Sequence, residues 1–248
     1  MKVAAIYDMH GNLPALEAVL HEIRREKVDQ VVIGGDVIPG PMAREALECL
    51  LQLETPVQFI VGNCEVAVLA QMEGVAPSNL PEQAKEAIRW TAEQLDVELK
   101  GELASWPKTL QFRIPGLGEV LFCHATPRNE NECFTRMTAE ERLEPVFDGL
   151  GVDAVICGHT HMQFDRNIGK VRIVNAGSVG MPFGEPGAYW AMLGPGIDLR
   201  RTEYDLVRAG ERIRETNYPH ADDFAARSVL QPPGEEAMLE VFRKVELK

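Results

Sequence analysis

The sequence lacks the features that mark membrane proteins, secreted proteins and nucleic-acid-binding proteins. Its 248 residues contain no apolar run of the roughly 18 residues that a membrane-spanning helix needs, and no basic segment followed by an apolar secretion signal. Lysine and arginine total 25 against 38 aspartates and glutamates, and the net charge of −13 disfavours contact with a phosphate backbone or an anionic membrane. We therefore expect a cytoplasmic protein with no membrane partner and no nucleic-acid partner.

Cysteine is sparse, and its spacing excludes two common kinds of site. The five cysteines are odd in number and form no Cys-x-x-Cys pair, so neither a disulfide framework nor a structural zinc site is expected. They are Cys49, Cys64, Cys123, Cys133 and Cys157. No internal repeat or low-complexity linker divides the chain. With a hydrophobic fraction of 45%, a chain of this length can bury a sizeable core, and we expect one domain spanning residues 1–248.

The residues that are present are organised around Asp8-Met9-His10-Gly11-Asn12. Lys2–Tyr7 is an apolar run that predicts a buried strand, and Asn12 precedes an amphipathic pattern that predicts a capped helix. A direct passage from strand to helix is typical of ligand-binding crevices in α/β sheets. Asp8 and His10 are separated by one residue, so an extended backbone would direct both side chains to the same face. An oxygen donor and a nitrogen donor on one face can share a metal ion, although Asp-x-His also occurs in ordinary loops.

Four further apolar strands end in residues that can bind metal. Asp36 follows the strand expected at 30–33, and Asn63 follows the strand expected at 57–61. His124 is the last residue of the strand expected at 119–124, and the strand expected at 153–157 is followed by His159 and His161. Each residue, taken singly, is equally well explained as a capping aspartate, a turn asparagine or a histidine with a structural partner. Because five strands repeat the pattern and parallel strand ends meet at one crevice, we interpret the set as a single metal site.

The predicted ligands are the carboxylates of Asp8 and Asp36, the amide of Asn63, and four imidazoles. Seven donors exceed what one ion takes from a protein, but they suit two ions that share Asp36 as a bridge. Imidazole and carboxylate ligands without a thiolate favour manganese, iron, cobalt, nickel or zinc over calcium or magnesium. We expect two divalent transition-metal ions, with manganese as the first candidate.

The remaining segments supply helices and strands around these strand ends. Helices are expected over 41–53, 138–149, most of 66–106 and the tail 205–248, and strands over 170–175, 188–193 and 197–204, the last two antiparallel. Thr138 begins one helix, with Glu141 three residues on as a capping box requires. The 66–106 segment, with a loop expected at 77–81, carries none of the strand-end chemistry and could form a cap. That segment or the tail could form a homo-oligomer interface.

These motifs carry a family resemblance. Asp8-x-His10, Gly35-Asp36, Gly62-Asn63, His124 and Gly158-His159-Thr160-His161 stand in the order and spacing of the calcineurin-like metallophosphoesterases, from residue 3 to about residue 204. The resemblance implies an α/β fold with a four-layer β-sandwich, in which two mixed sheets are flanked by helices and a di-metal centre lies at one edge. It also implies that Asp8, His10 and His161 hold the first ion, that Asn63, His124 and His159 hold the second, and that Asp36 bridges them.

One branch of the family is closer than the others, and one position departs from the family pattern. Asn12 and the stretch 175–180 resemble the bacterial branch of small phosphodiesterases and of phosphatases that act on dinucleoside polyphosphates. Many members carry a histidine after the asparagine, where it assists the leaving group, but this chain has Cys64. A neutral thiol, with a pKa near ~8.5, is a poorer proton donor, so we expect leaving groups that need no proton, such as nucleotides or activated aryl groups. Cys64 is equally well explained as a small buried filler.

The expected function is hydrolysis of phosphoric esters or anhydrides at a di-metal centre. Two cations roughly 3.5–4 Å apart clamp a phosphoryl group and lower the pKa of a bridging water towards ~7, and the resulting hydroxide attacks phosphorus. Asn63, His124 and Cys64 are the candidate catalytic residues. Asn12 and Arg128 are the candidate substrate contacts, although an arginine in a polar loop is more often structural. The substrate is expected to be small, phosphorylated and nucleotide-like.

Three alternatives stay open. The chain could hydrolyse dinucleoside tetraphosphates. It could be a protein phosphatase, although Gly35–Pro41 lacks the second aspartate and the arginine of the Gly-Asp-x-x-Asp-Arg-Gly motif of those relatives. It could also be a metal-free scaffold, as in the retromer subunit that resembles these enzymes, but such degeneration should erase ligands, and all seven are present here.

Overall fold

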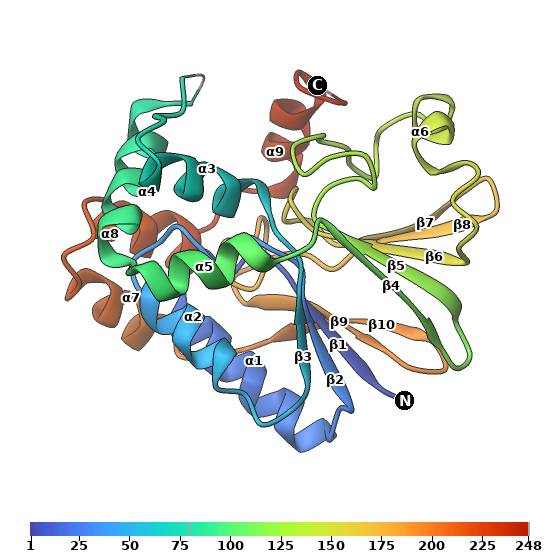
Figure 1. The fold of residues 1–248 in the computed structure, drawn as a ribbon, viewed down its shortest axis with the longest axis horizontal. Coiled ribbons are helices and arrows are strands. Elements are labelled where there is room, and N and C mark those ends of the chain that lie inside the picture. Colours follow the sequence, from blue (N-terminus) through green and yellow to red (C-terminus); the bar gives the residue numbers. More distant parts are fainter. Residues whose placement is uncertain (79, 248) are drawn as a thin grey trace.

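The computed structural model describes residues 1–78 and 80–247, and it contains two five-stranded sheets packed between helices (Figure 1). In spatial order, the first sheet consists of β10 (Ile197–Thr202), β9 (Ala188–Leu193), β1 (Val3–Ile6), β2 (Gln30–Ile33) and β3 (Val57–Phe59). The second consists of β4 (Thr109–Ile114), β5 (Gly118–Cys123), β6 (Ala154–Cys157), β8 (Val171–Asn175) and β7 (Phe164–Ile168). In the first sheet β1, β2 and β3 pair in parallel, and β9 pairs antiparallel with β1 and with β10. In the second sheet β5, β6 and β8 pair in parallel at the centre, and β4 and β7 are antiparallel at the edges. The predicted pair of mixed sheets is confirmed.

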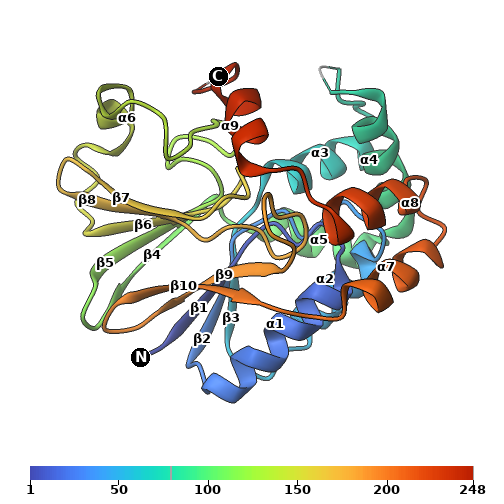
Figure 2. The ribbon, with the colours of Figure 1, turned by 180° about the vertical axis from the view of Figure 1, so that it is seen from behind.

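Helices cover the outer faces of both sheets and extend beyond one end of the sandwich (Figure 2). They are α1 (Leu13–Glu26), α2 (Ala43–Leu51), α3 (Asn63–Met72), α4 (Glu82–Gln94), α5 (Val97–Ser105), α6 (Glu140–Phe147), α7 (Leu206–Arg214), α8 (Ala221–Phe224), the π-helical segment η1 (Ala225–Leu230) and α9 (Glu235–Arg243). The predicted helical character of 66–106 and of the tail is confirmed. Within the described ranges, no helix has the length and apolar character needed to cross a membrane.

Strand β1 shows why the central strands are apolar at every position. Val3 and Ala5 pack in the cluster between the two sheets, whereas Ala4 and Ile6 pack against the helices outside the first sheet, with Leu16 of α1. Successive side chains of a strand point to opposite faces, so a strand covered on both faces needs an apolar residue at each position. The uninterrupted apolar runs of the sequence therefore correspond to strands buried between two layers.

The structure differs from the sequence-based expectations at two places. The edge strands β4 and β7 were not predicted, because polar residues such as Arg113 and Asp165 interrupt their apolar pattern. The capping box at Thr138 is wrong: its hydroxyl accepts from the N–H of Thr135 (2.9 Å) and donates to Glu246 (2.8 Å), and α6 begins at Glu140. The expected loop at 77–81 and the tail to 248 include residues 79 and 248, which lie outside the described residues.

Replacing Leu16 with alanine should lower the free energy of unfolding by about 2–5 kcal/mol, because this fully buried side chain would leave a cavity between α1 and the first sheet. Val97→Ala on α5, where the side chain is 80% exposed, should change it by less than about 0.5 kcal/mol. Urea denaturation followed by circular dichroism measures both values. Equal losses in the two variants would contradict the burial of α1 described here.

Candidate functional site

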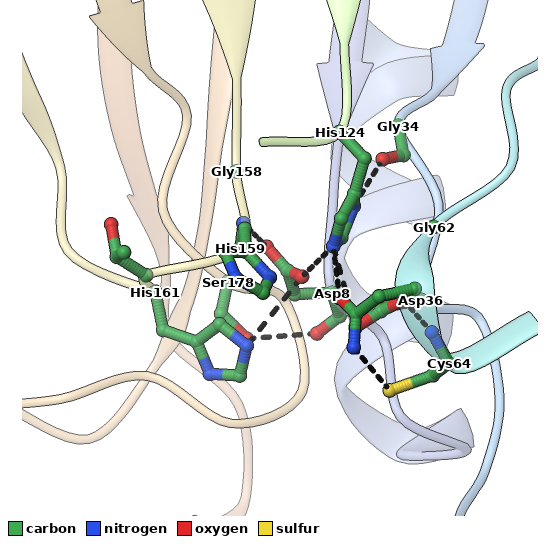
Figure 3. A network of polar contacts seen from close by, with 12 residues as sticks. Asp8, Gly34, Asp36, Gly62, Cys64, His124, Gly158, His159, His161 and Ser178 are labelled. Carbon is green, nitrogen blue, oxygen red and sulfur yellow. Dashed lines mark hydrogen bonds and ion pairs between the residues drawn. The ribbon is translucent and has the colours of Figure 1, made fainter. Parts of the chain in front are cut away.

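Strand ends from both sheets meet at one edge of the sandwich, and there the structure brings together all seven predicted metal ligands. Figure 3 labels Asp8, Asp36, His124, His159 and His161 among them. The first sheet supplies Asp8 and His10 after β1, Asp36 after β2, and Asn63 at the start of α3, beyond β3. The second sheet supplies His124 directly after β5, and His159 and His161 after β6. The cluster therefore exists only where the two sheets approach each other.

Asp8, His10 and His161 form the first of two groups, with ligand atoms that all lie within 4.8 Å of one another. Oδ1 of Asp8 lies 3.5 Å from Nε2 of His161, and that nitrogen lies 3.2 Å from Nε2 of His10. The Nδ1–H of His161 donates to the carbonyl of Met181 (2.7 Å), which directs Nε2 toward the cluster. These are the three residues predicted for the first ion.

Asp36, His124 and His159 form the second group, also within 4.8 Å. Nε2 of His124 lies 3.4 Å from Oδ2 of Asp36 and 2.9 Å from Oδ1 of Asn63, while its Nδ1–H donates to the carbonyl of Gly34 (2.8 Å). Oδ2 of Asp36 also lies 3.8 Å from Nε2 of His10, a member of the first group. Asp36 thus stands between the two groups, where a bridging carboxylate is expected.

The donor atoms of the first group fit a cation. Oδ1 of Asp8 is fully buried and accepts no well-aligned hydrogen bond from the described residues, and a buried acceptor without a partner is costly. Nε2 of His10 and Nε2 of His161 face each other at 3.2 Å, an arrangement in which both lone pairs can point at one shared ion. A divalent ion would partner all three atoms at once, so the residues present fit the metal that the sequence predicts.

Five of the seven predicted ligands have a left-handed backbone, which the sequence analysis did not foresee. The φ angles are 56° for Asp8, 46° for His10, 53° for Asp36, 67° for His159 and 58° for His161. The extended backbone expected for Asp8 and His10 is therefore wrong, although both side chains still reach one site. Such conformations cost about 1–3 kcal/mol each outside glycine. Backbone hydrogen bonds hold them here: the N–H of Asp8 donates to Gly35 (3.1 Å) and that of His10 to Asp36 (2.9 Å).

Charges within the cluster compensate one another. Burial alone would raise the pKa of Asp8 and of Asp36, but His161 and His124 outweigh burial and lower the pKa of these two carboxyls, respectively. Burial opposes protonation of His124, yet Asp36 raises its pKa to about 10; Asp8 likewise raises the pKa of His161 against the effect of burial. Burial lowers the pKa of His10 and of His159 to about 4. Both aspartates are therefore ionised, which is the form that binds cations.

Two glycines let the backbone approach these carboxylates. A Cβ at Gly62 would lie 2.2 Å from Oδ1 of Asp36, and one at Gly158 would lie 2.5 Å from Oδ2 of Asp8. The N–H groups that follow, those of Cys64 and His159, donate to the same oxygens at 2.9 Å. The glycines before Asn63 and His159 therefore allow backbone donors to orient the two aspartates.

Glu65 is a site residue that the sequence analysis missed. Its fully buried carboxylate accepts hydrogen bonds from the N–H groups of Asp36 (2.8 Å), Val37 (2.7 Å) and Gly62 (2.8 Å). Burial, followed by the charge of Asp36, raises the pKa of Glu65 to about 7. Glu65 ties the loop after β2 to the loop after β3 and so positions Asp36. The sequence did contain an indication of this role, because Glu65 is the third residue of the helix that begins at Asn63. A carboxylate at that position commonly accepts hydrogen bonds from backbone N–H groups at the start of the helix.

Cys64 lies at the cluster, as predicted for a residue near the chemistry. Its sulfur lies within 4.8 Å of ligand atoms of His10 and Asp36, and Nδ2 of Asn63 lies 3.5 Å from it. Burial, followed by the negative charge of Asp36, raises the pKa of the Cys64 thiol well above its usual range. The thiol is therefore neutral, and its chemical role stays a prediction.

Asn12 and Arg128, the predicted substrate contacts, have partners within the protein. Asn12 is fully buried; its Oδ1 accepts from the N–H of Ala15 (3.2 Å) as the cap of α1, and its Nδ2 donates to the carbonyl of Gly180 (2.9 Å). Arg128 donates twice to Glu132, at 3.1 and 2.7 Å. The helix cap at Asn12 is confirmed, whereas contact of either residue with a substrate stays a prediction.

Known proteins are similar to this chain over most of its length. An uncharacterised protein of Methanocaldococcus jannaschii is 29% identical over 237 residues, which cover 88% of this chain and 93% of that protein. A metallophosphoesterase of Sphaerobacter thermophilus has a solved structure with a TM-score of 0.71, at 26% identity, over 92% of this chain and 99% of that one. A hypothetical protein of Pyrococcus horikoshii OT3 shares the fold with a TM-score of 0.78, at 20% identity, over 94% and 99% of the chains.

The family comparison covers every strand of the two sheets except β10, and it covers every residue of the cluster. The model of the calcineurin-like phosphoesterase superfamily domain matches residues 1–194, a range that includes all of the strand ends described above. The expected resemblance is thereby confirmed, and this chain belongs to the calcineurin-like phosphoesterase superfamily.

Proposed function

We propose that this chain is a metal-dependent hydrolase of phosphoric esters or anhydrides whose centre holds two divalent transition-metal ions. The observation that carries the proposal is the pair of adjacent ligand groups, in which Asp36 of the second group lies 3.8 Å from His10 of the first. Membership of the superfamily supports phosphoesterase chemistry, and the similar protein of Sphaerobacter thermophilus is named a metallophosphoesterase. Manganese is our first candidate, followed by iron, zinc, cobalt and nickel, because imidazole and carboxylate donors suit these ions.

The residues of the chain prepare the site for this chemistry. Bound divalent ions polarise a phosphoryl oxygen and lower the pKa of water towards about 7. Asp8 and Asp36 supply the negative charge that holds cations, and the carbonyls of Gly34 and Met181 orient two imidazoles before any ligand arrives. Because the groups are held in place in advance, no reorganisation is needed when charge develops on the phosphoryl group.

The neutral thiol of Cys64 favours particular substrates within this class. A group with a raised pKa at the leaving-group position is a poor proton donor. Phosphodiesters with good leaving groups and nucleotide anhydrides need no such donor, and we propose them as the reactive bonds.

A metal-free scaffold on the same fold is the less favoured function. Five left-handed non-glycine residues and two buried carboxylates are expensive to maintain, and a scaffold would have no use for them. Their presence together supports a catalytic site.

Metal analysis tests the two ligand groups. After loading with manganese, the wild-type chain and His21→Ala, which changes an exposed histidine of α1, should retain two ions per chain by mass spectrometry. His161→Ala and Asp36→Asn should retain fewer, and hydrolysis of bis(p-nitrophenyl) phosphate should fall at least about 100-fold, because each removes a direct ligand. Thermal unfolding checks that both variants fold. Unchanged turnover in folded His161→Ala would refute the assignment.

Leaving-group dependence tests Cys64. Wild-type protein should hydrolyse p-nitrophenyl esters far faster than glycerol phosphate, whose alkoxide needs a proton as it departs. Cys64→His should raise the rate on glycerol phosphate at least about tenfold, because an imidazole can supply that proton. Cys49→Ala, in α2 and away from the cluster, is the control for loss of a thiol. Rapid hydrolysis of glycerol phosphate that survives Cys64→Ala would contradict the preference.

A further inference from the structure

A large cavity opens beside the predicted metal ligands. Hydrolysis of a phosphoric ester or anhydride at the cluster does not by itself require a cavity of this size. Its volume is about 750 Å³, within the range of sites that hold drug-sized organic molecules. His10, Asn63 and Cys64 are among the residues that line it, so the cavity reaches the cluster itself. The other walls come from α3, α4, the segment at 181–183 and the C-terminal segment that contains α8 and η1.

The walls of this cavity are mainly apolar. Ala70 and Ala84 line it from α3 and α4, and Phe183 and Phe224 line it from the 181–183 segment and α8. Phe183 also stacks on the ring of His161, with centroids 5.4 Å apart and an interplanar angle of 20°. The apolar wall is therefore continuous with the first ligand group, and aromatic faces in such a wall favour a ring-bearing ligand.

Three of the polar side chains that line the cavity lie against carboxylates of the protein. Of the described lining residues, Arg227 is the one arginine or lysine, and it forms an ion pair with Asp223 at 3.0 Å. Gln83 donates to Asp223 as well (3.2 Å), and Nε2 of His220 lies 3.0 Å from the carboxylate of Glu86. A chain of phosphates would meet this one arginine on the described walls, and its charge is already paired with a carboxylate.

Aromatic contacts hold the walls of the cavity together. Tyr218 packs edge-on against Trp90 of α4, with ring centroids 5.3 Å apart, and edge-on against Phe224 of α8 at 6.3 Å. The C-terminal segment is thereby attached to the helices of the 66–106 segment, and the cavity lies between them. The π-helical conformation of η1, which contributes Arg227, is of a kind that often occurs at functional sites.

We propose that this cavity binds a large, apolar, ring-bearing organic group attached to the phosphorus of the substrate. The inference rests on the proposed function, because the cluster is taken to hold the phosphoryl group. It narrows the substrate class to phosphoesters with an apolar substituent, and of the two kinds of reactive bond proposed above it favours the phosphodiesters over the nucleotide anhydrides.

A series of p-nitrophenyl diesters tests the inference, because every member releases the same leaving group and only the second ester group changes. With manganese-loaded protein, kcat/KM for the 1-naphthyl diester should exceed that for the methyl diester by roughly 10–100-fold, and it should also exceed that for the thymidine 5′ diester. Ala84→Phe and Ala70→Leu, which narrow the cavity, should each reduce the naphthyl-to-methyl ratio at least about fivefold. Arg89→Phe, which places the same ring on the exposed side of α4, should retain the ratio.

Calorimetric titration separates this inference from the proposed function. The non-hydrolysable 1-naphthylmethylphosphonate should bind with a Kd at least about tenfold lower than that of methylphosphonate, and Ala84→Phe should remove the difference. Naphthyl binding without hydrolysis of any diester would refute the proposed function and support the cavity's role. Hydrolysis of the methyl diester with no naphthyl preference in rate or binding would overturn the inference alone, as would a preference for thymidine. Absence of both binding and hydrolysis would refute both.

Discussion

Two buried carboxylates, Asp8 and Asp36, require positive charge close by, and the rest of the site is arranged to provide it. Both follow strands of the first sheet, and both are buried. The imidazoles nearest to them, His161 and His124, come from the second sheet, at 3.5 and 3.4 Å. The two sheets therefore meet at this edge through opposite charges as well as through the apolar cluster between them. Metal ions of charge +2 would satisfy the same carboxylates more completely than imidazoles do, because each ion can contact several donors at once.

The arrangement requires strained backbone conformations at the residues of the cluster. A strand that continued straight past Ile6 would carry Asp8 out of the sandwich, whereas the left-handed turns at Asp8 and His10 keep both side chains at the edge. Neighbouring segments hold these turns: Asp8 hydrogen-bonds through its backbone to Gly35 and Gly180, and the carboxylate of Glu65 accepts from the N–H of Asp36. The strain is therefore supported by hydrogen bonds from several parts of the chain, as is common where a structure prepares a site for ligands.

The metal-ligand candidates and the apolar cavity come from different parts of the fold. The paired sheets and the loops at their ends supply the metal ligands and account for most of the match to the superfamily. The 66–106 segment and the C-terminal helices contribute none of the seven predicted ligands, but they supply most of the wall of the apolar cavity. In the function that we propose, the sheet edge would determine the reaction, and the added helices would determine which substituent can accompany the phosphoryl group. The acidic net charge is compatible with this division, because attraction of the substrate depends on the local cations rather than on the whole surface.

Most of the central strands and the seven residues that cluster at the sheet edge were predictable from the sequence, because an apolar run that ends in a donor is a local feature. The edge strands β4 and β7 were not, since a strand with one neighbour tolerates polar residues that hide its pattern. Thr138 was misjudged because its hydroxyl is used by Glu246, which is 108 positions away in the sequence. Glu65 was passed over because its partners belong to another strand's loop.

The sequence by itself determined the identity of the donors, their order along the chain and the class of ion that they suit. Only the tertiary structure decided that His10 and His161, separated by 151 positions, face each other at 3.2 Å, that Asp36 stands between the two groups, and that an apolar cavity adjoins them. The reason is physical: residue type and strand periodicity are properties of short segments, whereas distances across two sheets follow from how distant segments pack.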